Sequence, residues 1–352
     1  MQHYTFPYTE VFHCTAGDCP DSCCKGWEIV IDPKTLQTYQ QTCSPIGETI
    51  RSTLTKNEDD EWIFQNRKDG NCPFWNAEKL CDLQIQAGEH LLCDTCRQFP
   101  RIPQDYTLFT EHVLSLACPE AARLVLTQTE PFQAIPLTQA EPSEPINEAE
   151  LPYSLNWMNC LLETRAVLLQ LFQETSIPLA EALCYGLHYV QQFQNWIEEK
   201  TDDFPELQPI PSEPVFLHHE SVQHLYDTLE WMTPEWADWM QQIRQHPVTD
   251  ADLQAFAEVA EPWIPAFRNF CSYYLYLYWL QALNTGNALI QYQKLLTALH
   301  EIAIVSAWKL RETHTYTLTD CMIIVQRYAK EVMHDAENIE KIEDVLYNLG
   351  SL

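Results

Sequence analysis

Cysteine is the residue type whose spacing in this sequence most clearly indicates chemistry. Ten of the 14 cysteines lie within the first 118 residues, and the remaining 234 residues hold four. Thiolates are the ligands that zinc and iron–sulfur clusters prefer in proteins. The concentration of thiols near one end of the chain therefore predicts a metal-binding segment there.

The spacing of these thiols leaves more than one kind of site open. The ten positions are Cys14, Cys19, Cys23, Cys24, Cys43, Cys72, Cys81, Cys93, Cys96 and Cys118. A structural zinc site takes four ligands, usually as two close pairs, and an iron–sulfur cluster takes four thiolates at more varied spacing. The ferredoxin run C-x2-C-x2-C is absent. Zinc, an iron–sulfur cluster and a plain core of buried thiols are all compatible with the pattern.

The charge balance excludes one class of partner. The chain has 20 Lys+Arg against 50 Asp+Glu, a formal net charge of −30. Because nucleic-acid binders neutralise phosphates with cations, we expect no nucleic-acid partner. The longest apolar run, 270–280, is about half of a membrane-spanning helix, and the first residues lack a secretory signal. We therefore expect a soluble cytoplasmic protein without membrane insertion, whose cysteines stay reduced.

The composition divides the chain into three parts. Residues 128–152 are rich in Pro, Glu and Gln and poor in large apolar residues, which predicts a linker. We expect a small irregular cysteine-rich metal-binding domain over 1–127 and an all-α helical bundle over 153–352. The fold class is therefore predicted to be mainly α.

The expected elements differ between the two domains. In the first domain we expect a brief strand at 26–33 and short helices at 34–41, 77–87 and 119–127. Downstream, apolar residues recur at the helical period, which predicts helices at 155–174, 179–199, 220–231, 250–259, 267–283, 288–310 and 318–333. The Pro-containing segments 204–214 and 233–234 are predicted to be loops or bends.

Two other segments contain residues that could form a site. His219-Glu220-x3-His224 is one residue longer than the zinc-protease motif, so the two imidazoles lie about 140° apart around a helix and no protease is expected. The aromatic stretch 270–279 could stack an adenine or enclose a methylammonium group. A segment that is apolar on nearly all sides instead favours the buried centre of a bundle.

Several cysteines stand in local patterns that are found together in one known family. The patterns are Phe12-His13-Cys14, Cys19, Asp21-Ser22-Cys23-Cys24-Lys25-Gly26-Trp27, Gly70-Asn71-Cys72-Pro73, Leu80-Cys81, Thr95-Cys96, Phe99-Pro100-Arg101 and Cys118-Pro119-Glu120. Over residues 10–127 the chain resembles the flagellin lysine-N-methylase family. The adjacent cysteines and Cys-Arg-x-Phe-Pro also resemble a broader cysteine-cluster group that chelates zinc or iron. The helical remainder carries no matching motif.

The resemblance implies an enzyme that uses S-adenosylmethionine to methylate lysine side chains of a protein substrate, flagellin-like in kind. It also implies a [4Fe-4S] cluster, with Zn²⁺ as the alternative, held by some of the matching cysteines. These are Cys14, Cys19, Cys23, Cys24, Cys72, Cys81, Cys96 and Cys118. Cys43 and Cys93 fall outside the family pattern. Spacing does not decide which four cysteines hold the cluster, and eight thiolates could hold two metals.

The cofactor site is less defined. Arg97 and Arg101 are candidates to bind the carboxylate of S-adenosylmethionine, since a guanidinium matches a carboxylate; no catalytic residue is assigned. The chain lacks both the Cys-x3-Cys-x2-Cys run and a G-x-G-x-x-G turn, which excludes an ordinary radical enzyme barrel and a Rossmann-type methyltransferase. A zinc-stapled, non-catalytic helical scaffold and an iron–sulfur electron carrier are the alternative functions.

Overall fold

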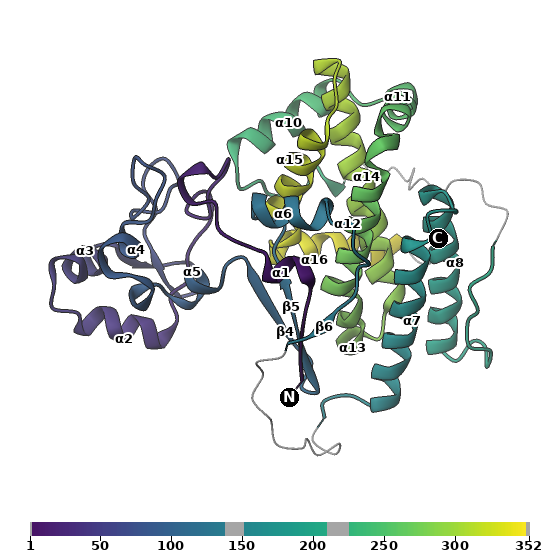
Figure 1. Cartoon of the computed structure of the whole chain (residues 1–352), viewed down its shortest axis with the longest axis horizontal. Helices are drawn as coiled ribbons and strands as arrows, with labels where there is room; N and C mark the ends of the chain where they lie inside the picture. Colours follow the sequence, from purple (N-terminus) through teal and green to yellow (C-terminus); the bar gives the residue numbers. More distant parts are fainter. Residues whose placement is uncertain (1, 138–150, 210–224, 350–352) are drawn as a thin grey trace.

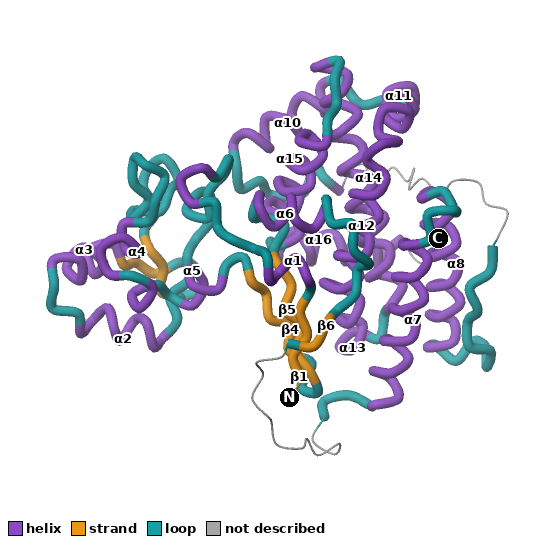
Figure 2. The backbone as a smooth tube through the Cα atoms, viewed as in Figure 1, coloured by secondary structure: helices purple, strands orange, loops and turns teal. Residues whose placement is uncertain are grey.

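The computed structural model describes residues 2–137, 151–209 and 225–349. The chain is mainly α, as predicted. An irregular lobe that holds most of the N-terminal cysteines extends from one side of a larger helical body, and a small sheet lies where they join (Figure 1, Figure 2). We call residues 14–98 the cysteine lobe and the rest the helical body. None of the helices in the described ranges is long and apolar enough to cross a membrane.

The two parts have separate hydrophobic cores. Buried residues between positions 29 and 93, such as Tyr39 and Phe64, form the core of the cysteine lobe. The core of the helical body includes Phe6 and Val113, which precede and follow the lobe in sequence. The cores therefore divide the chain differently from the predicted 1–127 domain, because both flanks of the lobe pack with the helices.

A four-stranded sheet causes this difference. Its strands are β1 (Gln2–Thr5), β4 (Arg101–Asp105), β5 (Phe109–Leu114) and β6 (Ile135–Pro136), in the order β4-β5-β1-β6. β1 runs parallel to β5 and antiparallel to β6. None of these strands was predicted, since each is only two to six residues long.

The start of the predicted linker belongs to the fold. Phe132 is 3% exposed and packs in the core of the helical body, and Ile135 pairs with Thr5. Two apolar side chains in the stretch predicted as a linker thus find partners on α12 and β1. Residues 138–150 lie outside the described ranges.

Short capped elements build the cysteine lobe. They are α2 (Pro33–Gln41), α3 (Pro45–Thr53), β2 (Leu54–Lys56), β3 (Trp62–Phe64), α4 (Asp82–Ala87) and α5 (Asp94–Gln98); α1 (Pro7–Glu10) precedes them. Asp32 caps α2 by accepting a hydrogen bond from Thr35 N at 2.8 Å. The strand expected at 26–33 is reduced to one isolated bridge, Val30 with Ile63, because this cap and Pro33 start a helix there.

The body is built from helices, and most of them are longer than those of the cysteine lobe. They are α6 (Pro119–Leu126), α7 (Leu155–Gln173), α8 (Leu179–Ile197), α10 (Pro234–Gln245), α11 (Asp250–Ala260), α12 (Ile264–Tyr278), α13 (Ala282–Thr285), α14 (Ala288–Thr313), α15 (Leu318–Tyr328) and α16 (Ala336–Leu349). The predictions for α7, α8, α11 and α14 are confirmed, with ends that differ by at most three residues.

Other helix predictions are corrected. The bend expected at 233–234 is the start of α10, where the Thr233 side chain accepts a hydrogen bond from Trp236 N. The single helix expected over 267–283 is interrupted after Tyr278 by a 3₁₀ turn, and α15 passes into a π-helix, Ala329–Met333. Of the helix expected at 220–231, residues 220–224 lie outside the described ranges together with His219, and residues 226–231 form a turn and a loop.

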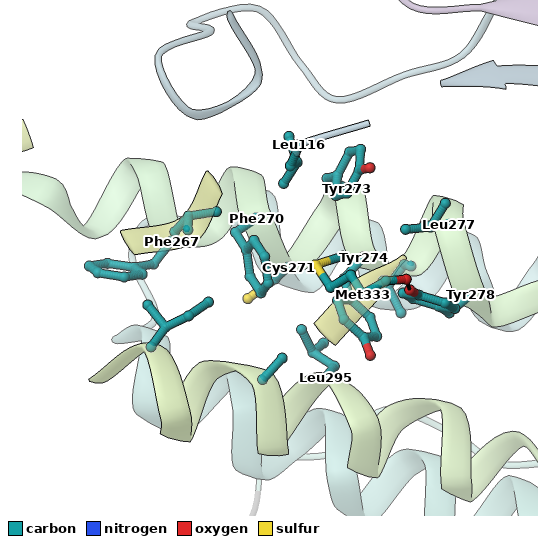
Figure 3. Close-up of a cluster of buried hydrophobic side chains, with 14 of the residues drawn as sticks. Leu116, Phe267, Phe270, Cys271, Tyr273, Tyr274, Leu277, Tyr278, Leu295 and Met333 are labelled. Carbon is teal, nitrogen blue, oxygen red and sulfur yellow. Dashed lines mark hydrogen bonds between the residues drawn. The ribbon is translucent and has the colours of Figure 1, made fainter. Parts of the chain in front are cut away.

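The aromatic stretch at 270–279 is the centre of the helical body. Phe270, Tyr273 and Tyr274 on α12 are at most 2% exposed, and Figure 3 shows them among side chains that include Leu295 of α14. The Trp279 indole N–H donates to Leu161 O at 2.8 Å. The stretch is therefore buried core, the interpretation that its composition favoured.

Candidate metal centre

Backbone pairing between two loops brings cysteines together in the lobe. The peptide N–H of Cys72 donates to Cys24 O at 2.8 Å, and that of Gly26 donates to Gly70 O at 3.3 Å. Both glycines have positive φ, +92° and +76°, a conformation that glycine adopts without steric cost. The loop that holds the adjacent cysteines thus lies along the loop that holds Cys72.

A second turn adds Cys81. The N–H of Asp82, the first residue of α4, donates to Phe74 O at 2.8 Å. An isolated bridge joins Trp75 and Cys81. Cys81 is the N-cap of α4, so a helix N-terminus points toward the site.

Four thiols meet where these loops converge. The thiol of Cys24 makes hydrogen bonds with those of Cys23, Cys72 and Cys81. These bonds lower the pKa of Cys23 and Cys72, and lower that of Cys81 to about 6; they raise the pKa of Cys24, which keeps the proton that it shares. Peptide N–H groups at the start of α4 also favour the Cys81 thiolate. We call these four residues the thiol cluster.

Cys93, which lies outside the family pattern, is part of the same core. It is fully buried and its pKa is lowered by a hydrogen bond with the thiol of Cys96. Both cysteines pack in the hydrophobic core that contains Cys72. Its C-x2-C spacing to Cys96 is the spacing of a metal-binding knuckle.

The remaining cysteines lie elsewhere. Cys14, Cys19 and Cys118 are close enough to influence one another electrostatically, and burial raises the pKa of Cys118 to about 11 and also raises that of Cys19. Cys14 is exposed. Cys43 is also exposed, with its thiol 3.5 Å from Gln41 O. The eight family-matching cysteines thus form separate groups.

The thiol cluster is a set of suitable donors rather than a preformed coordination sphere. In the part of the chain that the structure describes, no three His, Cys, Asp or Glu side chains are arranged around a common metal position. Three thiols around that of Cys24 nevertheless supply the four-thiol donor set of zinc and iron–sulfur sites. Binding of a metal there would release the protons that the thiols share.

The two candidate cofactor-binding arginines have different partners. Arg97 pairs with Asp94 at 2.9 Å and donates to Leu92 O at 2.5 Å, which braces the first turn of α5. The guanidinium of Arg101, at the start of β4, lies 5.3 Å from the centroid of the Phe12 ring. The structure does not bring the two side chains to one shared site.

The helical body contributes two polar side chains to the junction with the cysteine lobe. Lys330 Nζ donates to Asp21 Oδ2 at 2.9 Å, and Gln326 Nε2 donates to the same oxygen at 3.2 Å. Burial alone would raise the pKa of Asp21, but Lys330 brings it below its usual value. Sequence reasoning missed both residues, since 309 positions separate Lys330 from Asp21.

Comparison with known proteins places the chain in a family. No protein-family model and no solved structure matches it. The flagellar biosynthetic protein FliU of Salmonella muenchen is 35% identical over 120 residues, which cover 33% of this chain and 71% of FliU. The lysine-N-methylases of Salmonella typhimurium and Salmonella choleraesuis are also 35% identical over 120 residues, but the match spans only 30% of their length. On these similarities, the chain belongs to the family of FliU and the flagellin lysine-N-methylases.

Proposed function

We propose that this protein methylates lysine side chains of a protein substrate, flagellin-like in kind, with S-adenosylmethionine as methyl donor. Two relatives are named lysine-N-methylase and a third is named for flagellar biosynthesis, which supports both the reaction and the class of substrate. The acidic chain, with a net charge of −30, would attract lysine-bearing segments.

We further propose that the thiol cluster holds a [4Fe-4S] cluster. The observation that carries this proposal is the gathering of the Cys23, Cys72 and Cys81 thiols around that of Cys24, with Cys93 and Cys96 in the core that contains Cys72 and Cys81. When bound, the group would cross-link three loops of a lobe that has only short elements, the role that metals have in many small folds. Zn²⁺ on the same thiolates is the alternative.

The reaction sets a requirement on the lysine. The S–CH₃ bond of the sulfonium breaks and an N–CH₃ bond forms, the sulfur keeps the electron pair, and S-adenosylhomocysteine leaves. Because a lysine ammonium has a pKa of about 10.4, it must first lose a proton to become nucleophilic. An apolar pocket or a neighbouring base has to supply that change.

Anaerobic purification tests the metal. We expect a brown protein with broad absorption from sulfur-to-iron charge transfer, and iron and sulfide in stoichiometric amounts. Cys24→Ser should lose this absorption, whereas Cys43→Ser, an exposed cysteine outside the cluster, should keep it. A colourless protein with stoichiometric zinc would contradict the iron–sulfur proposal and support the alternative.

A reaction assay tests the activity. The anaerobic protein is incubated with S-adenosylmethionine and flagellin, and methyl-lysine is detected by mass spectrometry while chromatography identifies the nucleoside product. We expect S-adenosylhomocysteine to accompany methylation; reductant-dependent 5′-deoxyadenosine would instead indicate electron transfer to the cofactor. If metal-loaded protein methylates no lysine substrate, the chain is better explained as a metal-stapled scaffold.

A further inference from the structure

Lys330 is a buried lysine at the junction of the two parts of the molecule. It lies in the π-helix Ala329–Met333 that continues α15, and its side chain is 3% exposed. π-helical turns are rare and occur frequently at functional sites. Because burying an ammonium group is unfavourable unless its charge is compensated, the groups around Lys330 indicate its role.

The contacts of Lys330 come from the cysteine lobe. Its ammonium group donates to Asp21 at 2.9 Å and lies 5.7 Å from the centroid of the Trp27 ring. Gln326, one turn earlier, donates both to Asp21 at 3.2 Å and to Ala117 O at 2.8 Å. Asp21 and Trp27 stand on either side of the adjacent cysteines in sequence, so Lys330 contacts both ends of the segment that holds them.

This segment is tied internally to the cysteines. The Trp27 indole N–H donates to Cys23 O at 2.7 Å, and the N–H of Cys24 donates to Ser22 Oγ at 3.1 Å. The positive charge of Lys330 also acts on the thiol of Cys23. Lys330 therefore lies within electrostatic range of the thiol cluster as well as of Asp21.

Two neighbouring charged side chains, Glu331 and Arg97, have other partners. Glu331 accepts hydrogen bonds from Met232 N at 2.6 Å and Thr233 N at 3.3 Å, and so faces the start of α10. Arg97 pairs with Asp94. Neither charge shares the contacts of Lys330 with the segment 21–27.

We propose that Lys330 is the countercharge that the helical body presents to the thiolates, so that it favours the reduced, more negative state of the bound cluster. This inference rests on the proposed metal site. One aspartate already balances the lysine, and thiolate ligands add further negative charge beside it. A cation near an iron–sulfur cluster raises its reduction potential, because net charge is one of the factors that set this potential.

The test compares reduction potentials of reconstituted variants by redox titration. In Lys330→Met we expect the equilibrium constant for reduction to fall about tenfold, a shift of about 59 mV for a one-electron couple. Asp21→Asn removes a negative charge at the same place and should raise the potential. If the ion pair acts only as a structural link, its loss should shift the reduction potential of both variants in the same direction. That result would overturn the proposal, and so would an unchanged potential in Lys330→Met.

Lys294→Met is the matched control. Lys294 is also buried, pairs with Glu343 at 2.5 Å and lies 4.8 Å from the Tyr278 ring, but it belongs to α14 and not to the lobe junction. Its substitution should leave the potential unchanged. Lys330→Arg should keep most of the wild-type potential. If Lys330→Met does not fold, the reduction potential of Asp21→Asn becomes the deciding measurement. A potential that does not rise in Asp21→Asn would then refute the proposal.

Metal analysis of the wild type separates this inference from the proposed function. If the protein binds zinc and no iron, the iron–sulfur proposal fails, and Zn²⁺ affinity measured by chelator competition becomes the readout. We then expect about tenfold weaker binding in Lys330→Met than in Lys294→Met. Equal affinities in the two variants would refute the role of Lys330.

Discussion

At the scale of single residues, two cysteines that occupy the same position at the start of a helix have very different pKa values. Cys81 and Cys118 are both N-caps, yet the pKa of Cys81 is lowered to about 6 and that of Cys118 is raised to about 11. Cys81 receives a hydrogen bond from the thiol of Cys24, whereas burial dominates at Cys118. Neighbouring thiols, more than the helix terminus, therefore distinguish candidate ligands from buried thiols.

Cys93 gives the first prediction. Because its thiol contacts that of Cys96, Cys93→Ser should weaken metal binding by roughly 10- to 100-fold, the effect expected for a ligand or its immediate support. Cys43→Ser is the matched control, since Cys43 is exposed. Metal affinity is measured by competition with a chelator. If Cys93→Ser keeps full metal affinity, Cys93 is not part of the metal site, as the family pattern implies.

His334 gives a pH-dependent prediction. Its Nε2 lies 2.7 Å from Ser115 Oγ, and burial lowers its pKa to about 4. The unfolded chain, with a histidine pKa of about 6.5, binds more protons between these values, so stability is lost as pH falls from about 6.5 to about 4. We expect a loss of about 1–3 kcal/mol from this residue.

Urea unfolding at several pH values from about 7.5 to about 4.5 measures this loss, because this range covers most of the interval between the unfolded and folded pKa values of the histidine. Carboxylates also titrate at the lowest of these pH values. The informative quantity is therefore the difference in the free energy of unfolding between wild type and His334→Gln, and this difference should become smaller as the pH falls. His246→Gln, at an exposed histidine, is the control. An equal dependence on pH in wild type and His334→Gln would contradict the assignment.

At the scale of elements, one buried ion pair fixes the sheet against the helices. Arg165 of α7 pairs with Glu111 of β5 through two hydrogen bonds, at 2.8 and 2.6 Å, and both side chains are at most 7% exposed. The guanidinium also lies 4.5 Å from the centroid of the Tyr276 ring on α12. Three elements thus meet at a single arginine.

Substitution of this arginine gives an element-scale prediction. Arg165→Met leaves a buried carboxylate without its partner, and should reduce the free energy of unfolding by about 3–5 kcal/mol. The double variant Arg165→Met/Glu111→Leu removes both charges and should be clearly more stable than the single variant. Urea unfolding measures both. A double variant no more stable than Arg165→Met would show that packing, and not charge, dominates at this site.

At the scale of the whole molecule, the cysteine lobe is an insertion into the helical body. Residues before and after it form adjacent strands of one sheet, and the Arg101 side chain lies over Phe12, so the two ends of the lobe are close. Figure 1 shows the lobe attached at this point and extended away from the helices.

Two truncated proteins test this arrangement. A chain in which a short Gly/Ser linker replaces residues 14–98 keeps the whole core of the helical body and should unfold cooperatively. A chain that begins at residue 128 lacks β1, β4, β5 and α6, and should be unfolded or aggregated. Circular dichroism during heating distinguishes the outcomes. Stable folding of the second protein would restore the predicted 1–127 boundary.

The sequence by itself determined the features that repeat or cluster locally. Helical periodicity gave the long helices of the body, because each buries one stripe of apolar residues that the chain itself spaces. The density of thiols indicated a candidate metal site in the first 118 residues, and the charge balance disfavoured nucleic acid. These inferences need only neighbouring residues or total counts.

Tertiary structure alone decided which residues meet. Strands of two to six residues, such as Ile135–Pro136, carry too few side chains to show a period, and only pairing with neighbouring strands creates them. Cys24 meets Cys72 through backbone hydrogen bonds between distant loops, and Lys330 meets Asp21 across 309 positions. Such contacts depend on how packed cores place the loops, which no local pattern of residues encodes.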